Sequence, residues 1–319
     1  MGGLRKDRSA FAASAEIHGA IESAMGRGNA VDAVCTGMLL ACALDETVAW
    51  GSASLVVAGF GMSPRRLDGR VLQPGNGARR PRGFRPEEEI PSAAFVPVPR
   101  LFAAIGTAVT LAGRATYTGI SAPAVASCAN DARRALLQSF SALGPALFQN
   151  RSIAEEIRLS AGPGAKGALC AEDLAIAAPS FEDLAVLDED IFASAAAGEI
   201  AYHESTLEWL GARDSSGLIC FASIERASDG HRIEALGVVA PRSAVPVRRG
   251  VQRVDPTTPL GSLPPVRVEV RDGQIFAVEG LHGHTSALAA FERSAVRRTS
   301  ADAVAAFPEL GVVRMERAS

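Results

Sequence analysis

Hydrophobic positions recur at helical spacing through most of the first half of the chain. The spacing predicts helices over residues 11–24, 30–44, 101–112, 125–143 and 153–159, with a short one at 171–174. Gly26, Arg27 and Gly28 suit the end of the first helix, and Asn29 suits the N-cap of the second. These two helices are therefore expected to meet at a glycine–asparagine hinge.

Strand signals dominate the second half, from Thr206 onward. An earlier buried strand is expected at 54–59, and short apolar runs predict later strands at 217–223, 233–240, 266–271 and 274–278. Asp272 and Gly273 predict a tight hairpin between the last two strands. Residues 64–99 are rich in Pro, Arg and Gly and are predicted to form the longest loop, and residues 286–298 return to a helical pattern.

The order of these elements indicates the fold class. Helices come first and strands second, without the regular alternation that builds a doubly wound parallel sheet. The length of 319 residues allows one large or two ordinary domains. The sequence therefore predicts an α+β layered fold.

Composition and charge narrow the possible partners and the compartment. With 48% hydrophobic residues the chain can bury a large core, and 35 acidic against 32 basic residues give a net charge of −3. We expect no nucleic-acid partner, because no net positive field is available to hold a phosphate backbone. Charge interrupts every long apolar stretch, so no membrane segment or signal peptide is expected. The five cysteines form no C-x-x-C pair, which favours reduced thiols and a cytoplasmic protein.

Motifs for nucleotides and metals are missing from the sequence. Gly59 and Gly61 are followed by Pro64, where a dinucleotide fingerprint needs its third glycine, and no phosphate-binding G-x-x-x-x-G-K-[ST] string occurs. His282 and His284 have metal-like spacing but no obvious third ligand. We therefore expect no cofactor and no metal.

Four ordered sequence blocks carry a resemblance to a known family. Residues 28–34 read G-N-A-V-D-A-V and are similar to the G-N-A-V-D-A-A element of gamma-glutamyltransferases. Residues 146–179 resemble that family's block ending in E-D-L-A and proline. Residues 255–265 and 272–284 then stand where the family has its P-x-x-S-S-M-S-P and D-G … G-S-P-G-G segments. The chain is thus similar to a shortened gamma-glutamyltransferase.

This resemblance implies an N-terminal-nucleophile (Ntn) hydrolase with a four-layer αββα sandwich. It implies one domain over 1–319, with a large-subunit-like segment at 1–205 and a small-subunit-like segment at 206–319. Family members cut themselves just before a threonine, whose hydroxyl becomes the nucleophile. A hydroxyl needs a base, and the new α-amino group lies close to it and titrates near neutral pH.

Two residues compete for the role of nucleophile. The family's D-x-x-G turn corresponds to Asp214–Gly217, and counting back from it without a gap reaches Leu207, which has no hydroxyl. One inserted residue brings Thr206 to the position, and two bring Ser205. We therefore expect Thr206 to be the nucleophile, with Ser205 as the alternative, although both residues can equally do no more than begin a strand. The family's glutamyl-binding Thr and Asn correspond to Glu225 and Ala227, so those contacts are expected to be lost.

The resemblance also assigns the rest of the site. Gly283 and His284 replace the glycine pair whose amides form the oxyanion hole, and the imidazole of His284 adds a possible acid or base. His282 and the pair Gly261 and Ser262 are expected to contact substrate, with Ser262 keeping one of two carboxylate donors. The family's carboxylate-binding arginine corresponds to Arg79 or Arg80, although either can equally be a solvated surface residue.

Three functions remain open on the sequence alone. The first is an amide hydrolase or acyltransferase that acts on a small, carboxylate-bearing amide through an acyl-enzyme, with a homo-oligomer possible. The second is a catalytically degenerate relative that acts as a binding or partner subunit, indicated by Leu207, Glu225 and Ala227. The third is an unprocessed hydrolase that pairs His203, His282 or His284 with a cysteine such as Cys220.

Overall fold

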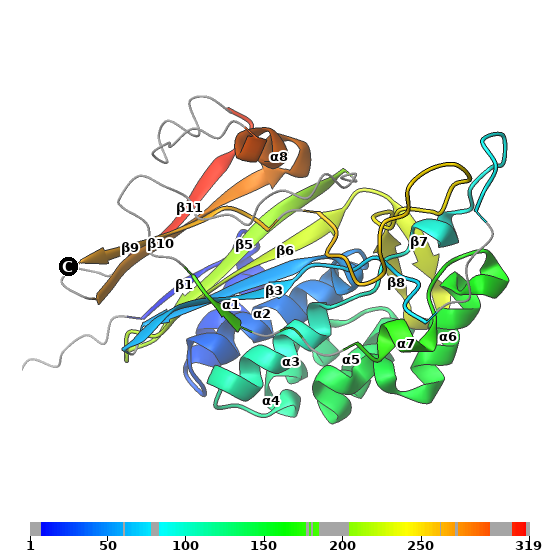
Figure 1. The fold of residues 1–319 in the computed structure, drawn as a ribbon. Helices are drawn as coiled ribbons and strands as arrows, with labels where there is room; N and C mark the ends of the chain where they lie inside the picture. The colour runs from blue at the N-terminus through cyan, green and yellow to red at the C-terminus, as the bar shows by residue number, and fades with distance from the viewer. Residues whose placement is uncertain are drawn as a thin grey trace, which may run out of the picture.

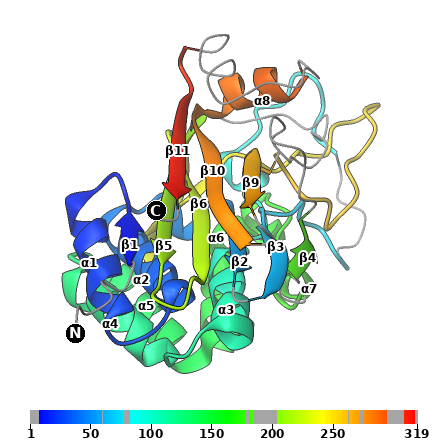
Figure 2. The same cartoon turned by 90° about the vertical axis from the view of Figure 1, so that its left-hand side faces the viewer.

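The fold is a layer of helices against a curled antiparallel sheet, seen in a computed structural model (Figure 1). The structure describes residues 8–59, 61–77, 83–176, 179, 181–184, 204–261, 263–271, 274–293 and 308–316. Within these ranges the helices of the first two-thirds of the chain lie on one face of the sheet, and the strands near the C-terminus lie over the other face (Figure 2). The predicted α+β class is confirmed.

The helical layer follows the predicted pattern closely, with differences at helix ends. It contains α1 (Ala15–Met25), α2 (Ala30–Leu44), α3 (Leu101–Ala112), α4 (Tyr117–Ser127), α5 (Asp131–Leu143), α6 (Arg151–Ala161) and α7 (Ala171–Leu174). Helix α1 begins later than predicted because Ser14 caps it, accepting from the amide of Ile17. The single helix predicted at 125–143 is wrong, because Asn130 caps a new helix and separates α4 from α5.

The main sheet has the strand order β11-β10-β5-β6-β2-β3-β4, with β1 beside β5 and β9 beside β10. Its strands are β1 (Ser9–Phe11), β2 (Ala53–Gly59), β3 (Met62–Gly69), β4 (Phe181–Asp183), β5 (Ser205–Arg213), β6 (Ile219–Ala227), β9 (Val266–Arg271), β10 (Gln274–His284) and β11 (Gly311–Glu316). A separate hairpin pairs β7 (Gly230–Ile233) with β8 (Val238–Pro241). The strand predicted at 233–240 is thus split, with a 3-10 turn at Glu234–Leu236 between its halves.

Strand β3 corrects the long loop predicted for 64–99. It forms six residue pairs with β2, and its Arg66 is buried. The guanidinium of Arg66 donates to the hydroxyl of Ser54 at 3.0 Å and to the carbonyl of Pro264. A run rich in Arg and Pro looks like a loop in sequence, because the acceptors that allow its arginine to be buried come from distant segments.

Two hydrophobic cores hold the layers together. The larger core lies between the helices and the sheet, and α2 runs through it with every residue buried except Leu44. The smaller core lies between β5, β6 and the strands β9 to β11, where Trp209 and Phe221 stack at 4.6 Å. Gly280 on β10 must lack a side chain, since a Cβ there would lie 2.3 Å from the Trp209 ring.

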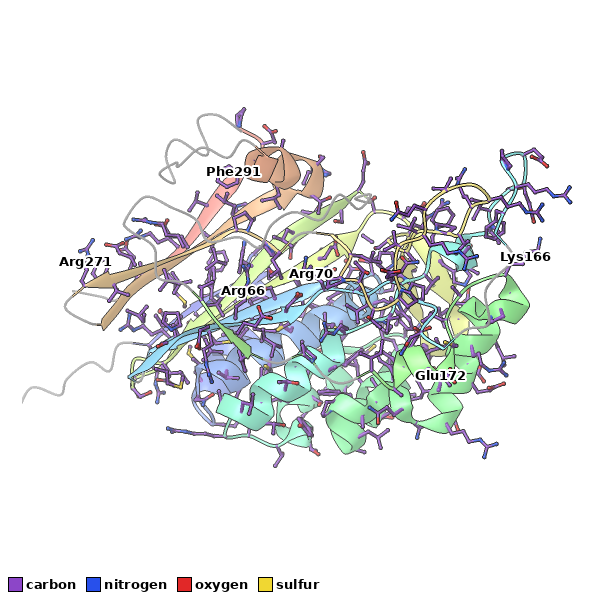
Figure 3. The ribbon with its side chains drawn as sticks, viewed as in Figure 1. Arg66, Arg70, Lys166, Glu172, Arg271 and Phe291 are labelled. Atoms are coloured by element: carbon purple, nitrogen blue, oxygen red, sulfur yellow. The ribbon has the colours of Figure 1, made fainter. Side chains whose placement is uncertain are left out.

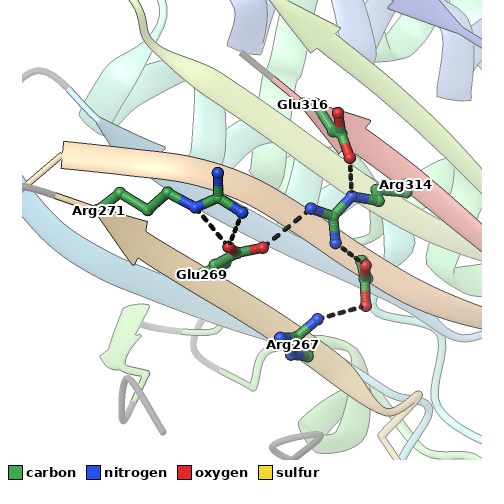
Figure 4. A network of polar contacts seen from close by, with 6 residues as sticks. Arg267, Glu269, Arg271, Arg314 and Glu316 are labelled. Carbon is green, nitrogen blue, oxygen red and sulfur yellow. Dashed lines mark hydrogen bonds and ion pairs between the residues drawn. The ribbon is translucent and has the colours of Figure 1, made fainter. Parts of the chain in front are cut away.

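The strands of the second layer also carry a network of arginine and glutamate side chains (Figure 4). Arg314 reaches Glu269, Glu279 and Glu316, while Arg271 makes a second contact with Glu269. Burial raises the pKa of Glu269, but hydrogen bonds from Arg271 and Arg314 outweigh burial, so its pKa lies below the ordinary value of a glutamate. The carboxylate of Glu269 is therefore kept charged by its two paired guanidinium groups.

One described helix, α8 (Thr285–Arg293), lies on the second layer, where it contacts β10 and β5. Its residues Ala287, Leu288 and Phe291 join the smaller core. A single nine-residue helix does not make a fourth layer, so the complete αββα sandwich remains a prediction. Within the described ranges, no helix is long and apolar enough to cross a membrane.

The motif at residues 28–32 builds the joint between α1 and α2. The Asn29 side chain accepts from the amides of Val31 and Asp32, and the Asp32 carboxylate accepts in return from the Asn29 amide at 2.9 Å. Asp32 also accepts from the amides of Arg114 and Ala115. This buried carboxylate therefore satisfies three backbone donors from two segments, which makes the motif a structural joint.

A second buried carboxylate explains another block that resembles the family. Asp173 accepts from the amide of Cys170 on its own helix and from the amides of Gly75 and Asn76 on a distant loop. The E-D-L sequence thus fastens α7 to the loop at residues 75–76. As with Asp32, the conformation depends on a side chain whose oxygens replace water as hydrogen-bond acceptors for backbone N–H groups.

Replacing Asp32 by Asn should lower the free energy of unfolding by about 2–4 kcal/mol, because an amide nitrogen cannot accept from the buried N–H groups. Asp131→Asn is the matched control: this aspartate is also in the first turn of a helix, but its side chain is 91% exposed. The control should change stability by less than about 0.5 kcal/mol. Urea denaturation measures both, and equal losses in the two variants would contradict the structural role of Asp32.

Candidate active site

The candidate site lies on the face of β5 and β6 that is turned away from helices α1 to α7. Successive side chains of a strand point to opposite faces, so Ser205, Leu207 and Trp209 share this face of β5 while Thr206 and Glu208 share the other. The register places Leu207 opposite Glu225 on β6. Strand pairing therefore brings together Leu207 and Glu225, two positions at which the sequence differs from the family that it resembles.

Ser205 is paired with a buried carboxylate. Its side-chain oxygen, Oγ, donates to Oε1 of Glu225 at 2.6 Å, and only 1% of the residue is exposed. The other oxygen of Glu225 accepts from the amide of Ser52 at 3.2 Å. The hydroxyl of Thr285, at the start of α8, lies 3.4 Å from Ser205 Oγ. A hydroxyl next to a fixed carboxylate has the arrangement of a nucleophile beside a base.

The carbonyl group immediately before Ser205 is held by two donors. The carbonyl oxygen of Glu204 accepts from the amide of Ser228 at 3.3 Å and from the Ser228 hydroxyl at 2.8 Å. The hydrogen bond from the Ser228 amide extends the pairing of β5 with β6 by one residue beyond the pair of Ser205 and Ala227. The hydrogen bond from the Ser228 hydroxyl is not part of the strand pairing. Together the two donors polarise the peptide bond between Glu204 and Ser205.

Thr206 occupies a different environment from Ser205. Its side chain is exposed and lies on the opposite face of β5 from Glu225. Its strand partner is His284, and the partner of Leu207 is Gly283. The structure thus places the backbone of the expected oxyanion pair directly beside the start of β5, near both candidate nucleophiles. The geometry favours Ser205 over Thr206 for contact with a carboxylate.

A small cavity opens next to Glu225. Its volume is about 40 Å³, and its lining includes Ser52, Arg70, Leu207, Ser223, Glu225, Ser243, Leu260, Gly261, Thr285 and Leu288. Arg70, near the centre of Figure 3, is held by a salt bridge to Asp68 and donates to the carbonyl of Gly261. The expected binding residue Gly261 therefore reaches the site, with its carbonyl fixed by an arginine.

The other expected binding residues are not brought into this cavity by the described structure. Ser262, Arg79 and Arg80 lie outside the described residues. His282 is half-buried on β10 and packs against Gly311, where a Cβ would lie 2.0 Å from its ring nitrogen. Over the described ranges, no three His, Cys, Asp or Glu side chains gather as metal ligands would.

The cysteines do not serve this site. Cys220 lies on β6 but belongs to the core on the helix side of the sheet, the opposite face from Glu225. Burial raises its pKa well above the ordinary value of a thiol, and burial raises the pKa of Cys42 to about 12. His203, its proposed partner, lies outside the described residues. A buried thiol with a raised pKa is a poor nucleophile.

Four residues of the site were not identified as functional from the sequence: Ser223, Glu225, Ser228 and Thr285. Glu225 and Thr285 hold Ser205, Ser228 holds the preceding carbonyl, and Ser223 lines the cavity. In the sequence, Glu225 stands where the family has a threonine, but this difference indicates only that a substrate contact is lost. Ser228 and Thr285 approach the site only because of how the strands pair, and the sequence does not specify this register.

A much larger cavity, of about 920 Å³, lies among the loops beyond this site. It is lined by residues from 73–75, 83–88, 163–168, 245–247 and 253–256. The chain segment from Val71 to Gln73 runs between the two cavities, with Val71 lining the small one and Gln73 the large one. Backbone bonds fix this segment, because Leu260 donates to Val71 and Gln73 donates to Thr258.

Comparison with solved structures agrees with this geometry at the level of the fold. The chain is similar to a cephalosporin acylase from Bacillus halodurans, with a TM-score of 0.68, 13% identity and coverage of 90% of this chain and 81% of that one. It is also similar to LmbA2991, with a TM-score of 0.61, 12% identity and coverage of 92% and 82%. These are Ntn-hydrolase folds, so this chain shares that fold.

Other comparisons show weaker similarity or none. A gamma-glutamyltranspeptidase from Pseudomonas nitroreducens superposes with a TM-score of only 0.46 at 14% identity, over 57% of this chain and 66% of that one. No protein-family model matches the sequence, and no characterised protein matches it in a sequence search.

The folded protein should resist thiol alkylation at Cys35, Cys42 and Cys220, because burial raises the pKa of each thiol and excludes the reagent. Iodoacetamide at pH 8 followed by peptide mass spectrometry tests this prediction. The same protein in guanidinium chloride is the control, and there all five cysteines should react. Rapid native labelling of Cys220 would support the cysteine-based reading instead.

Proposed function

We propose that this protein is a self-cleaving amide hydrolase or acyltransferase that uses Ser205 as its nucleophile and acts on a small amide through an acyl-enzyme. The observation that carries the proposal is the 2.6 Å hydrogen bond from Ser205 Oγ to the buried Glu225 carboxylate. The fold shared with an acylase supports the general class of reaction. The chemistry has two stages, and different groups act in each.

In the first stage, the chain cuts itself between Glu204 and Ser205. Ser205 Oγ transfers its proton to Glu225 and attacks the Glu204 carbonyl carbon through a five-membered ring. The carbonyl oxygen gains negative charge, which the two Ser228 donors stabilise. The C–N bond then breaks as the nitrogen of Ser205 takes up a proton, leaving an ester, and one water hydrolyses that ester. The products are residues 1–204, with a new carboxylate, and residues 205–319, with a free α-amine.

In the second stage, the new α-amine takes the proton of Ser205 Oγ while the hydroxyl attacks a substrate amide. An α-amine titrates near neutral pH, so it is partly unprotonated under ordinary conditions and acts as the base. Backbone amides of Gly283 and His284 lie beside the start of β5 and are the proposed oxyanion donors. The amine portion leaves, and water or a second amine takes the acyl group from Ser205.

The carboxylate that the sequence predicted on the substrate fits this scheme as part of the leaving amine. Its proposed ligands Arg79, Arg80 and Ser262 lie outside the described residues, and Arg70 at the small cavity is engaged by Asp68. His282 and Gly261 remain proposed substrate contacts at the rim of the site. The cytoplasmic location and a homo-oligomeric assembly likewise stay predictions.

A second candidate function rests on Leu207. Its side chain lies at the ungapped nucleophile position and lines the small cavity, where a catalytic hydroxyl would otherwise stand. A chain that keeps the fold without the nucleophile would be a binding or partner subunit. The two candidates differ in one measurable property, because a binding subunit needs no cleavage of its own chain.

The intact masses of the purified protein, measured over prolonged incubation, test the proposal. Two fragments, residues 1–204 and 205–319, are expected, because the polarised carbonyl is that of Glu204. Ser205→Ala should abolish cleavage, whereas Thr206→Ala should leave the cleavage site and its rate unchanged. Ser228→Ala should slow cleavage about 100-fold, since it removes one of two oxyanion donors.

Glu225→Gln should also slow cleavage, because an amide cannot take the proton of Ser205. Glu208→Gln is its matched control: Glu208 lies on the other face of β5 and pairs with Arg226. Equal slowing in both variants would show that β5 was merely disturbed. A chain that stays whole would favour the binding subunit, and fragments cut before Thr206 in the Ser205→Ala variant would assign the nucleophile to Thr206.

A further inference from the structure

The small cavity beside Glu225 is placed to receive the acyl portion of a substrate attached to Ser205. Glu225 and Thr285 both line it, and both approach the Ser205 hydroxyl, at 2.6 and 3.4 Å. A group bonded to Ser205 Oγ would therefore lie at its edge. This inference rests on the proposed function and adds the class of acyl group to it.

The size of the cavity limits that group. A volume of about 40 Å³ exceeds the roughly 10–15 Å³ that one water needs and is far below the roughly 300 Å³ of a typical ligand pocket. Leu207, Leu260 and Leu288 contribute to its walls, and each is at most 6% exposed. Packed leucines do not open without cost, so the cavity accepts only a few heavy atoms.

The chemistry of the cavity requires a polar atom in that group. The Ser223 side-chain oxygen is completely buried and has no hydrogen-bond partner among the residues that the structure describes. Leaving a buried hydroxyl without a partner is unfavourable, and a hydrogen bond to a ligand atom or a water would remove this cost. Ser223 lines the cavity on the same strand and face as Glu225, so a partner placed between them can contact both.

The hydrogen-bonding capacities identify the kind of polar atom. The Ser223 hydroxyl can donate or accept, whereas the Glu225 carboxylate can only accept. A ligand hydroxyl can donate to the carboxylate and accept from the serine, so it matches both. A ligand carboxylate, such as that of a glutamyl group, is too long for the cavity and would face the like charge of Glu225, while the guanidinium of Arg70 in the lining is already paired with Asp68.

We propose that the cavity is an acyl pocket selective for short hydroxyacyl groups, with N-glycolyl amides as the simplest members of the class. Ser223 recognises the distal hydroxyl, and Leu207 limits the length of the acyl chain. The residue that replaces a nucleophile in the family alignment thereby becomes a specificity residue in this chain. The amine portion of the substrate lies outside this pocket.

Hydrolysis of four 4-nitroanilides tests the assignment with the full-length, incubated protein: N-glycolyl, N-acetyl, N-butyryl and γ-glutamyl. We expect kcat/KM for the glycolyl compound to exceed that for acetyl at least 10-fold and that for γ-glutamyl at least 100-fold, because loss of a buried hydrogen bond and like charge both discriminate strongly. Ser223→Ala should reduce the preference for glycolyl over acetyl to below 3-fold. Leu207→Ala should raise the butyryl rate relative to acetyl.

Ser139→Ala is the matched control for the serine substitution, because this serine is half-buried on α5 and its hydroxyl donates to the carbonyl of Ala135 in the same helix. It should retain the full preference for glycolyl. Equal rates for glycolyl and acetyl amides in the unsubstituted protein, or a preference for γ-glutamyl, would overturn the acyl-pocket assignment while leaving the proposed function in place.

A binding measurement separates failure of this inference from failure of the proposed function. In the uncleaved Ser205→Ala protein, glycolamide should raise Tm more than acetamide does, and the additional Ser223→Ala change should remove the difference. If no amide is hydrolysed but this difference is seen, the pocket stands and the catalytic proposal falls. If glycolamide and acetamide act equally, the pocket assignment falls, whatever the enzyme does.

Discussion

The pairing of β5 with β6 is the constraint on which the rest of the site depends. Nine residue pairs fix the register of these two central strands, from Ser205 with Ala227 to Arg213 with Ile219. This register turns Ser205 and Glu225 to one face and brings Ser228 to the carbonyl of Glu204. A slip of one residue would exchange the two faces, burying Thr206 and exposing Ser205. The large cores on either side of these strands oppose such a slip, because both faces carry packed apolar side chains.

Buried carboxylates have two different roles in this molecule. Asp32, Asp173 and Asp214 accept mainly from backbone amides and join segments that are distant in sequence. Glu225 accepts one backbone amide as well, but its other oxygen takes a side-chain hydroxyl and its residue borders a cavity. The donors to the first three carboxylates are mainly backbone amides, which are fixed by the chain and do not react. The last is bonded to a group that can react, and this difference separates the candidate site from the structural joints.

Two of the differences from the gamma-glutamyltransferase pattern lie at one pair of strand positions. Leu207 and Glu225 face each other across β5 and β6, where that pattern has two hydroxyl-bearing residues. The two positions are strand partners, and the carboxylate of Glu225 accepts from Ser205, two residues before Leu207. Under the proposed function, these two substitutions together move the reactive hydroxyl from the position of Leu207 to Ser205.

The sequence determined the local structure and the joints of this protein. Helix α2 begins and ends where the pattern predicted because its N-cap, Asn29, and its apolar residues are local signals. The ordered blocks also led to the Ntn-hydrolase type of fold, with which the solved structures agree. Tertiary structure decided the rest. β3 is a strand because Arg66 finds acceptors on Ser54 and Pro264, and β11 forms because β10 offers it an edge. The choice between Ser205 and Thr206 likewise depends on which face of β5 meets Glu225. That is a property of register and packing between segments, which no short stretch of sequence contains.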